Sequence, residues 1–149
     1  MTIGIVIPFR GTDLDKSRLR EDMDEISVRY ILNRMTQQVI FEIMKLDKKV
    51  NLYVLSKSKV SFDGKYQIAE DQGQNLNDSL QIYTSKMNET IIMIIMADLP
   101  LINKSHINNI LGAANLLEQN EVDSAQEINV VINYKSMLVS QFTYVLQML

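Results

Sequence analysis

Two charged segments of the sequence each follow an apolar run. The first apolar run ends at Arg10 in Ile5–Arg10 (IVIPFR), and the basic segment Lys16–Leu19 (KSRL) follows it. The second run is Ile91–Met96 (IIMIIM), and Ala97–Pro100 (ADLP) comes directly after it. Basic side chains, together with a carboxylate that holds a metal ion, are the groups that bind a triphosphate. In open α/β sheets, ligands lie beyond the carboxyl ends of the strands. Because both segments follow predicted strands, the sequence predicts a nucleotide-handling site there.

The basic loop is the first half of that site. Lys16 and Arg18 flank Ser17 just before a predicted helix. A lysine offers phosphate oxygens a point charge and an arginine a planar fork, and amides at a helix N-terminus add donors. The alternative is a solvated loop whose basic side chains pair with neighbouring carboxylates. The segment is not a P-loop, and the sequence contains no Gly-x-Gly-x-x-Gly dinucleotide fingerprint.

The aspartate that follows the second apolar run is the other half. Asp98 comes after six apolar residues and precedes Leu99 and Pro100, which end the strand. A carboxylate in that place is a hard oxygen ligand for Mg²⁺ bridging phosphate oxygens. The alternative is a turn-forming or capping aspartate, which is common at strand ends.

A polar segment, Glu70–Asn77 (EDQGQNLN), precedes a predicted helix and contains one glycine. Its amides and carboxylates supply both donors and acceptors, so they could recognise the edge of a base. The simpler interpretation is a strand-to-helix connection in which Asn75 is the N-cap. On this segment alone, the simpler interpretation is favoured.

Other reactive residue types offer little. His106 is the only histidine and is expected on the surface, near a helix start, rather than as a catalytic base. The chain has no cysteine, which excludes disulfides, thiolate metal sites and cysteine nucleophiles and fits a reducing cytoplasm. No Ser-His-Asp triad can be assembled from the sequence.

The elements that must position these residues alternate between strands and helices. Strands are predicted at residues 2–8, 50–55, 66–69, 90–96 and 128–133, and helices at 20–46, from about 76, and from Ser105 as N-cap. Strands buried on both faces and connected by helices predict an α/β fold with a mostly parallel sheet and helices on both faces. The first helix has apolar residues at helical spacing that are expected to face the core: Met23, Ile26, Tyr30, Met35, Val39, Ile43 and Leu46.

The totals describe one ordinary domain, residues 1–149. The chain is 46% hydrophobic and 22% charged, with a net charge of −3. An acidic protein of this kind has no basic field for wrapping nucleic acid, and the longest apolar run is far shorter than a membrane span of roughly 20 residues. The N-terminus also lacks the pattern of a signal peptide. We therefore expect a cytoplasmic protein with small-molecule substrates, and neither nucleic-acid nor membrane partners.

Taken in order, the segments resemble the 2-phospho-L-lactate guanylyltransferase family of deazaflavin coenzyme biosynthesis. The resemblance lies in Val6–Arg10, Lys16–Leu19, the helix from Asp22 to Met35, Asp71–Asn77 (DQGQNLN) and Ala97–Leu101 (ADLPL). It covers residues 3 to about 118 with the family's spacing. The Lys-Ser-Arg-Leu segment is the most specific part, since Ala-Asp-Leu-Pro also occurs in other nucleotidyltransferases.

The resemblance implies a three-layer, Rossmann-like nucleotidyltransferase fold with a mixed sheet, and an enzyme that uses GTP with Mg²⁺. A phosphate oxygen of 2-phospholactate, or of phosphoenolpyruvate in some members, would attack the α-phosphorus and release pyrophosphate. Such chemistry depends on positioning and charge neutralisation. By the same resemblance, Lys16, Arg18 and Asp98 are catalytic and Asp98 binds the metal. The implied nucleotide-binding residues are Arg10, Lys16, Ser17, Arg18, Asp71, Gly73, Asn75 and Asn77.

The sequence departs from the family's pattern in two places. Where members have Pro-Asp-Arg-Gly-Gly-Gly-Thr-Asn, this chain has Val122–Asn129 (VDSAQEIN), without the arginine and the three glycines. It also ends at Leu149, whereas members continue for roughly 50 residues, so we expect a shortened or divergent C-terminal part. Two alternatives therefore stay open: a nucleotide-binding member without catalysis, and a related nucleotidyltransferase with another acceptor. A homodimer is one way to complete the acceptor pocket.

Overall fold

The structure, a computed structural model, describes residues 1–10, 23–99, 101–120, 128–132 and 144–148. Its strands are β1 (Ile3–Pro8), β2 (Asn51–Ser56), β3 (Gln67–Glu70), β4 (Ile91–Ile95), β5 (Ile128–Ile132) and β6 (Tyr144–Met148). Its helices are α2 (Glu25–Met44), α3 (Leu76–Thr84) and α4 (Lys104–Asn120). No helix of this described part is both long and apolar enough to cross a membrane.

All six strands belong to one sheet, in the order β3-β2-β1-β4-β5-β6. Every neighbouring pair is parallel except β5 and β6, which are antiparallel. The mostly parallel, mixed sheet predicted from the sequence is therefore confirmed. The last strand, β6, is additional, because beyond residue 133 the sequence pattern predicts no element.

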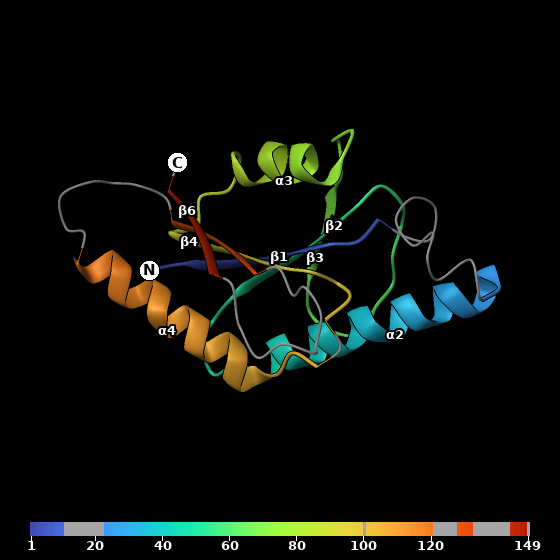
Figure 1. Cartoon of the computed structure of the whole chain (residues 1–149), viewed down its shortest axis with the longest axis horizontal. Coiled ribbons are helices and arrows are strands. Elements are labelled where there is room, and N and C mark those ends of the chain that lie inside the picture. Colours follow the sequence, from blue (N-terminus) through green and yellow to red (C-terminus); the bar gives the residue numbers. More distant parts are fainter. Residues whose placement is uncertain (11–22, 100, 121–127, 133–143, 149) are drawn as a thin grey trace.

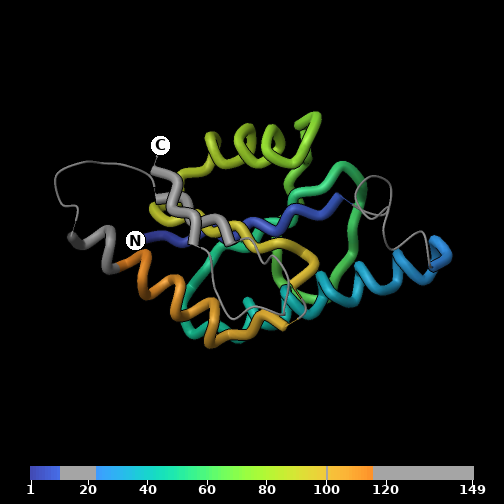
Figure 2. The backbone as a smooth tube through the Cα atoms, in the orientation of Figure 1, coloured from blue at the N-terminus to red at the C-terminus, as the bar shows by residue number. Residues whose placement is uncertain are grey.

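Three layers result from this arrangement. In Figure 1, α3 lies on one face of the sheet, and α2 and α4 lie together on the other. Figure 2 shows the same layers along the backbone trace. Helices on both faces are the usual consequence of parallel strands joined by helical crossovers. The three-layer expectation is confirmed.

Side chains of β1 alternate between two apolar cores. Ile5 belongs to the core that α2 and α4 cover, together with Val39 of α2 and Leu111 of α4. Val6 belongs to the core that α3 covers, with Leu80 packed against it. Since successive strand side chains point to opposite faces, the continuous apolar run of β1 follows from burial on both faces.

The first half of helix α2 differs from its prediction in register, whereas Val39 and Ile43 are buried as expected. The residues it buries include Val28, Leu32 and Thr36, whereas Ile26 and Tyr30, expected in the core, are 82% and 64% exposed. The buried Thr36 hydroxyl donates to the Leu32 carbonyl at 2.8 Å. A polar residue can thus occupy the core face when its hydroxyl is satisfied within the helix, and it interrupts the apolar spacing from which the register was predicted.

The first residue of α2 was also misplaced. The helix begins at Glu25 rather than near residue 20, because Asp24 has extended backbone angles and acts as the N-cap. Its carboxylate accepts hydrogen bonds from the Ser27 amide at 2.9 Å and the Ser27 hydroxyl at 2.7 Å. The bond from the Ser27 amide is the main reason why the pKa of Asp24 is lowered. A satisfied N-cap of this kind ends the extended segment.

Helix α4 begins one residue before its predicted cap. Asn103, not Ser105, accepts a hydrogen bond from the His106 amide, at 3.0 Å. The Lys104 amide donates to the buried Glu42 carboxylate of α2 at 3.0 Å. These two acceptors satisfy amides of the first turn, and the second joins α2 to α4. His106 is partly buried there rather than on the open surface.

Candidate functional site

The carboxyl ends of β1, β2, β3 and β4 meet at one edge of the sheet, which we call the carboxyl edge. From β1 the chain continues to β2 and β3 on one side, whereas β4 pairs with β1 on the other side. The order of strands therefore reverses between β1 and β4. In open α/β sheets, ligands bind in the crevice beyond the carboxyl ends at such a reversal.

Arg10 and Asp98 lie on either side of that reversal. Val6 of β1 is paired with Ile94 of β4, and Arg10 and Asp98 each follow that pair by the same number of residues along parallel strands. The two charged residues predicted from separate motifs thus leave the sheet at the same level. The strand pairing brings the two chain segments side by side at this edge, which the sequence alone left as an expectation.

Asp98 is partly buried in a turn directly after β4. Leu99, which follows it, is only 7% exposed and belongs to the core beneath α2 and α4. Burial of the leucine anchors the chain immediately after the carboxylate. Within the described residues, no three His, Cys, Asp or Glu side chains gather as a metal site. A single carboxylate suits Mg²⁺ that arrives with a nucleotide, because this ion is held largely by substrate phosphates and waters.

Arg10 is engaged with residues that follow β3. Its Nη2 donates to the Ser79 hydroxyl at 3.0 Å, and its Nε lies 3.9 Å from Asp71 Oδ2. The Arg10 side chain is 12% exposed and that of Asp71 is 2% exposed. Because a buried carboxylate needs a cation or donors nearby, Arg10 stabilises the connection between β3 and α3. The contacts of Arg10 with Ser79 and Asp71 thereby join the β3–α3 loop to the end of β1.

Asp71 and Gly73 are the centre of that connection. The Asp71 amide donates to the Ser56 carbonyl at the end of β2, and Asp71 Oδ1 accepts from the Gly73 amide at 2.9 Å. A side chain at Gly73 would place its Cβ 2.2 Å from the Ser79 amide nitrogen. Only glycine allows the backbone to approach α3 so closely. Asp71 and Gly73 are thus in direct contact, and they determine the conformation of the loop between β3 and α3.

The remaining predicted residues of this segment lie at the start of α3. Asn75 is the N-cap, and its Oδ1 accepts from the Asp78 amide at 2.9 Å, as the simpler interpretation proposed. Asp78 in turn accepts from the Gln74 amide at 2.8 Å. Asn75 and Asn77 are exposed. Because α3 follows β3, these two amides lie beside the carboxyl edge, where a ligand can reach them.

Ser79 is the residue that the sequence analysis missed. It is 2% exposed, and its hydroxyl accepts from Arg10 while donating to the Asn75 carbonyl at 2.8 Å. A serine in the first turns of a helix has no distinctive pattern. The signal that existed was indirect: a glycine six residues earlier, next to a predicted cap.

The structure does not describe the basic loop. Lys16, Ser17 and Arg18 lie outside the described residues, as do Pro100 and most of the divergent segment at 122–129. The roles that the resemblance implies for them stay predictions. What the structure places at the carboxyl edge is Arg10, Asp71, Gly73, Asn75, Asn77 and Asp98.

Residues 3–132 match the protein family described as "Guanylyl transferase CofC like". Two curated relatives are both named 2-phospho-L-lactate guanylyltransferase. The protein from Methanocaldococcus vulcanius is 28% identical over 114 residues, which are 74% of this chain and 51% of that protein. The protein from Methanococcoides burtonii is 34% identical over 111 residues, 72% of this chain and 49% of that protein. The chain spans about half the length of these relatives.

Solved structures share the fold at lower identity. One, from Desulfovibrio desulfuricans G20, is described as a nucleotide-diphospho-sugar transferase; it has a TM-score of 0.60 and 14% identity over 89% of this chain and 58% of its own. Another is CMP:2-keto-3-deoxy-manno-octonic acid synthetase complexed with CTP, with a TM-score of 0.54 and 17% identity over 83% of this chain and 49% of its own. At these identities the likeness shows the fold alone, which is Rossmann-like.

Proposed function

Because the chain belongs to the family of CofC-like guanylyl transferases, we propose that it binds GTP at the carboxyl edge and transfers GMP to a 2-phospho-carboxylate. The acceptor we favour is 2-phospho-L-lactate, the substrate in the names of both curated relatives. The product would be used in making a deazaflavin coenzyme, as the resemblance of the motifs implies. A chain without cysteine suits the cytoplasm as the place for this step.

One observation supports this proposal: β1 and β4 are parallel neighbours, so the residues that follow them leave the sheet side by side, where the strand order reverses. Arg10 and Asp98 come from motifs 88 residues apart, counted from 10 to 98 in the sequence. Parallel pairing of β1 with β4 is what brings these segments to one place. Nucleotide sites in α/β sheets form at such reversals of strand order.

The reaction is a displacement at phosphorus. A phosphate oxygen of the acceptor attacks the α-phosphorus of GTP and forms a new P–O–P bond. The bond from the α-phosphorus to the oxygen bridging it to the β-phosphate breaks, and pyrophosphate leaves with that electron pair. Little covalent chemistry falls to the protein, whose task is to align the reactants and neutralise charge. The lack of a cysteine and of a well-placed histidine is therefore compatible with the activity.

The residues of the chain divide into two roles. Lys16 and Arg18 would neutralise the triphosphate, with Ser17 adding a hydroxyl donor, as basic residues do at phosphoryl-transfer sites. The exposed amides of Asn75 and Asn77 would contact the guanine and ribose side. Arg10, Asp71 and Gly73 are held by one another and by Ser79, so they would position the loop that bears those amides.

Asp98 would hold the magnesium ion that accompanies GTP. Bound there, the ion would supply charge neutralisation on phosphate oxygens. The donor set fits, because one carboxylate together with phosphates and waters is a common arrangement for this ion. The partial burial of Asp98 limits competing solvation of the carboxylate.

The experiment that tests this proposal is an assay of pyrophosphate release. The chain is incubated with GTP and Mg²⁺, and 2-phospho-L-lactate and phosphoenolpyruvate are offered separately, with ATP and CTP in place of GTP as controls. Release that requires GTP and one of these acceptors supports the proposal and identifies the acceptor. Release from GTP with neither acceptor present would mean transfer of GMP to water and would contradict the proposal, whereas release that requires ATP or CTP would indicate a related nucleotidyltransferase.

A second candidate is nucleotide binding without turnover. It is favoured by Val122–Asn129, which lacks the arginine and the glycines that the family has there. Without glycine the backbone cannot approach a ligand as closely. GTP binding measured by calorimetry, with no pyrophosphate released for any acceptor, would favour this candidate. If a homodimer completes the acceptor pocket, activity per chain would rise with protein concentration.

A further inference from the structure

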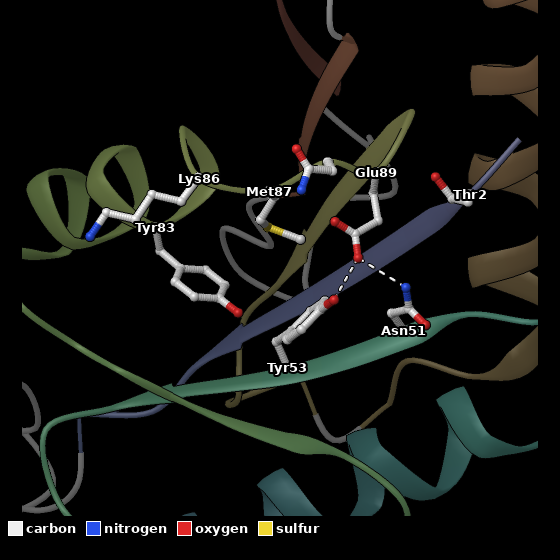
Figure 3. A pocket seen from close by; sticks show the side chains of 8 residues that line it. Thr2, Asn51, Tyr53, Tyr83, Lys86, Met87 and Glu89 are labelled. Carbon is white, nitrogen blue, oxygen red and sulfur yellow. Dashed lines mark hydrogen bonds between the residues drawn. The ribbon is translucent and has the colours of Figure 1, made fainter.

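A hollow lies at the edge of the sheet opposite to the carboxyl edge. It has a volume of about 280 Å³ and is lined by Thr2 before β1, by two residues of β2, by Tyr83 of α3 and by the segment between α3 and β4: Thr2, Asn51, Tyr53, Tyr83, Lys86, Met87, Asn88 and Glu89. We call it the amino-edge pocket. It lies on the α3 face of the sheet, at the other end of the strands from Arg10 and Asp98. Figure 3 shows its side chains from close by.

Gly4, the second residue of β1, makes room for two residues that line the pocket. Gly4 pairs with Asn51 on one side and with Ile92 on the other. A Cβ at Gly4 would lie 2.6 Å from Met87 Cε and 3.0 Å from Glu89 Cγ. The absent side chain therefore leaves the room that Met87 and Glu89 use as they cross β1. Elsewhere on this face the core is apolar, with Val6, Leu55 and Ile94 among its members.

Glu89 is fixed at the pocket by two donors. Its Oε1 accepts from the Tyr53 hydroxyl at 2.5 Å and from the Asn51 side-chain amide at 3.0 Å, the two dashed lines of Figure 3. Burial raises the pKa of Glu89, but these hydrogen bonds outweigh it, so the pKa is lowered overall. The carboxylate is therefore ionised and held in one orientation. Its other oxygen extends toward the side of Tyr83 and Met87 in Figure 3.

The lysine that lines the pocket is directed away from this carboxylate. Lys86 donates from Nζ to Gln72 Oε1 at 3.2 Å, and in Figure 3 its nitrogen points away from Glu89. Two tyrosine rings also border the hollow: Tyr53 and Tyr83 meet edge to face, with centroids 5.8 Å apart. An oriented carboxylate beside aromatic rings is the combination that attracts an organic cation, through charge and through the ring faces.

We propose that the amino-edge pocket binds a small organic cation: a primary ammonium group on a short apolar chain. The ammonium would donate to the Glu89 carboxylate oxygen that faces Tyr83 and Met87 and would lie against the ring of Tyr83, and the apolar chain would contact Met87. The volume is at the small end of ligand pockets, which matches a ligand of a few heavy atoms. A metal ion is a poorer fit, since no group of three ligating side chains gathers in the described residues.

The test uses the whole chain and n-butylammonium chloride as the probe. Amide resonances of Gly4, Asn51 and Glu89 are followed by NMR during titration. We expect saturable shifts with a dissociation constant of roughly 1–10 mM, as for a ligand of about five heavy atoms. n-Butanol and sodium butyrate, titrated at equal ionic strength, are expected to give at least tenfold weaker effects. Equal binding of n-butanol, or preferred binding of butyrate, would overturn the proposal.

Variants locate the probe. Glu89→Gln removes the charge and is expected to weaken binding at least tenfold, whereas Glu70→Gln, an exposed carboxylate at the other edge of the sheet, leaves it unchanged. Tyr83→Leu is expected to weaken binding several-fold, and Tyr83→Phe, which keeps the ring, to retain it. Unchanged binding in Glu89→Gln would overturn the proposal. If that variant does not fold, Gly4→Ala, which displaces Met87 and Glu89, must weaken binding for the proposal to stand. No nucleotide takes part, so the result is independent of the proposed GTP site.

Discussion

The two edges of the sheet hold polar groups in different ways. At the carboxyl edge the groups come from connections that leave the strands: Arg10, Asp71 and Asp98 all lie just beyond strand ends. At the amino edge, Asn51 and Tyr53 are strand residues, and Glu89 lies shortly before β4. Residues in the loops of the carboxyl edge can be substituted without altering strand pairing. Asn51 and Tyr53 at the amino edge are themselves paired strand residues, so their positions are set by the register of the sheet.

This difference explains why one edge was found from the sequence and the other was not. Residues beyond strand ends form short motifs, such as Ala97–Pro100, that contrast with the apolar run before them. Asn51 and Tyr53 instead alternate with apolar residues in β2, which is the ordinary pattern of a half-buried strand. Their meeting with Glu89 depends on Gly4 and on the packing of α3. A motif identifies the first kind of site, and only the fold identifies the second.

The largest expected effect is a loss of activity at the carboxyl edge without a loss of folding. We predict that Asp98→Asn lowers GTP-dependent pyrophosphate release about 100-fold or more, as loss of a group that stabilises developing charge does. The fold should remain intact, because Asp98 lies in a turn outside the strands. Circular dichroism and turnover at saturating Mg²⁺ measure both effects.

The matched control for that substitution is Asp63→Asn. Asp63 is exposed, and its hydrogen bonds to Gln37 are made by its backbone. Its activity should equal that of the unaltered chain. If Asp98→Asn is also fully active, Asp98 does not hold the metal, and the assignment of catalysis to the carboxyl edge loses its support from this residue.

The next effect tests how tightly the carboxyl edge is packed. Gly73→Ala places a Cβ against backbone atoms of Ser79 and should destabilise the chain by about 1–3 kcal/mol. Gly112→Ala is the matched control, because nothing lies within 4 Å of its Cβ and the residue is inside α4. There alanine should stabilise by about 0.5–1 kcal/mol. Urea unfolding measures both, and equal effects of the two substitutions would contradict the close approach at Gly73.

A smaller effect concerns the role of Arg10. Arg10→Met removes the cation beside the buried Asp71 and the bond to Ser79, so we expect a loss of about 1–2 kcal/mol in the free energy of unfolding. Arg10→Lys keeps the charge without the fork and should recover part of that loss. If neither substitution changes stability while both raise the KM for GTP, Arg10 contacts the nucleotide instead of positioning the loop.

The smallest effect belongs to the amino edge. Burial, and then the hydrogen bond to Glu89, raise the pKa of Tyr53 from 10.0 to about 12. Between these two values the unfolded chain releases the phenol proton while the folded chain keeps it, so stability is complete below about pH 10 and falls as the pH rises toward 12. After allowance for solvent screening, we expect this loss to be on the order of 1 kcal/mol.

Tyr53→Phe provides the comparison, because the variant has no phenol proton at this position. Its urea midpoint should fall less steeply than that of the unaltered chain between pH 9 and pH 11.5. Tyr83→Phe serves as the second tyrosine variant, since burial raises the pKa of Tyr83 as well. Parallel curves for the unaltered chain and Tyr53→Phe would contradict the environment assigned to Tyr53.

Much of the fold could be predicted because burial leaves a direct trace in sequence. β1 and β4 are apolar throughout since both of their faces are covered. The register of the first half of α2 could not be predicted, because the buried Thr36 satisfies its hydroxyl within the helix and resembles a surface residue in the pattern. Asn75 was identified as a cap since its side chain acts locally, on an amide three residues ahead.

The candidate site residues were accessible to a similar extent. Asp98 was singled out by its place after an apolar run, and Asp71 and Gly73 through the resemblance of their segment to a known family. Ser79 was not, because its role depends on an arginine 69 residues away that only the sheet brings near. Interactions along the chain are thus accessible to sequence reasoning, whereas those between distant segments require the strand order.

The most direct test of the central claim asks which edge binds the nucleotide. The ¹⁵N-labelled chain is titrated with GTP and Mg²⁺, and amide shifts are mapped onto the structure. We predict that the shifts concentrate at Arg10, in the segment 71–77 and around Asp98, and that Asp98→Asn weakens the effect of Mg²⁺ while Glu89→Gln does not. Shifts that concentrate instead at Gly4, Asn51 and Glu89, or their absence at saturating GTP, would contradict the claim.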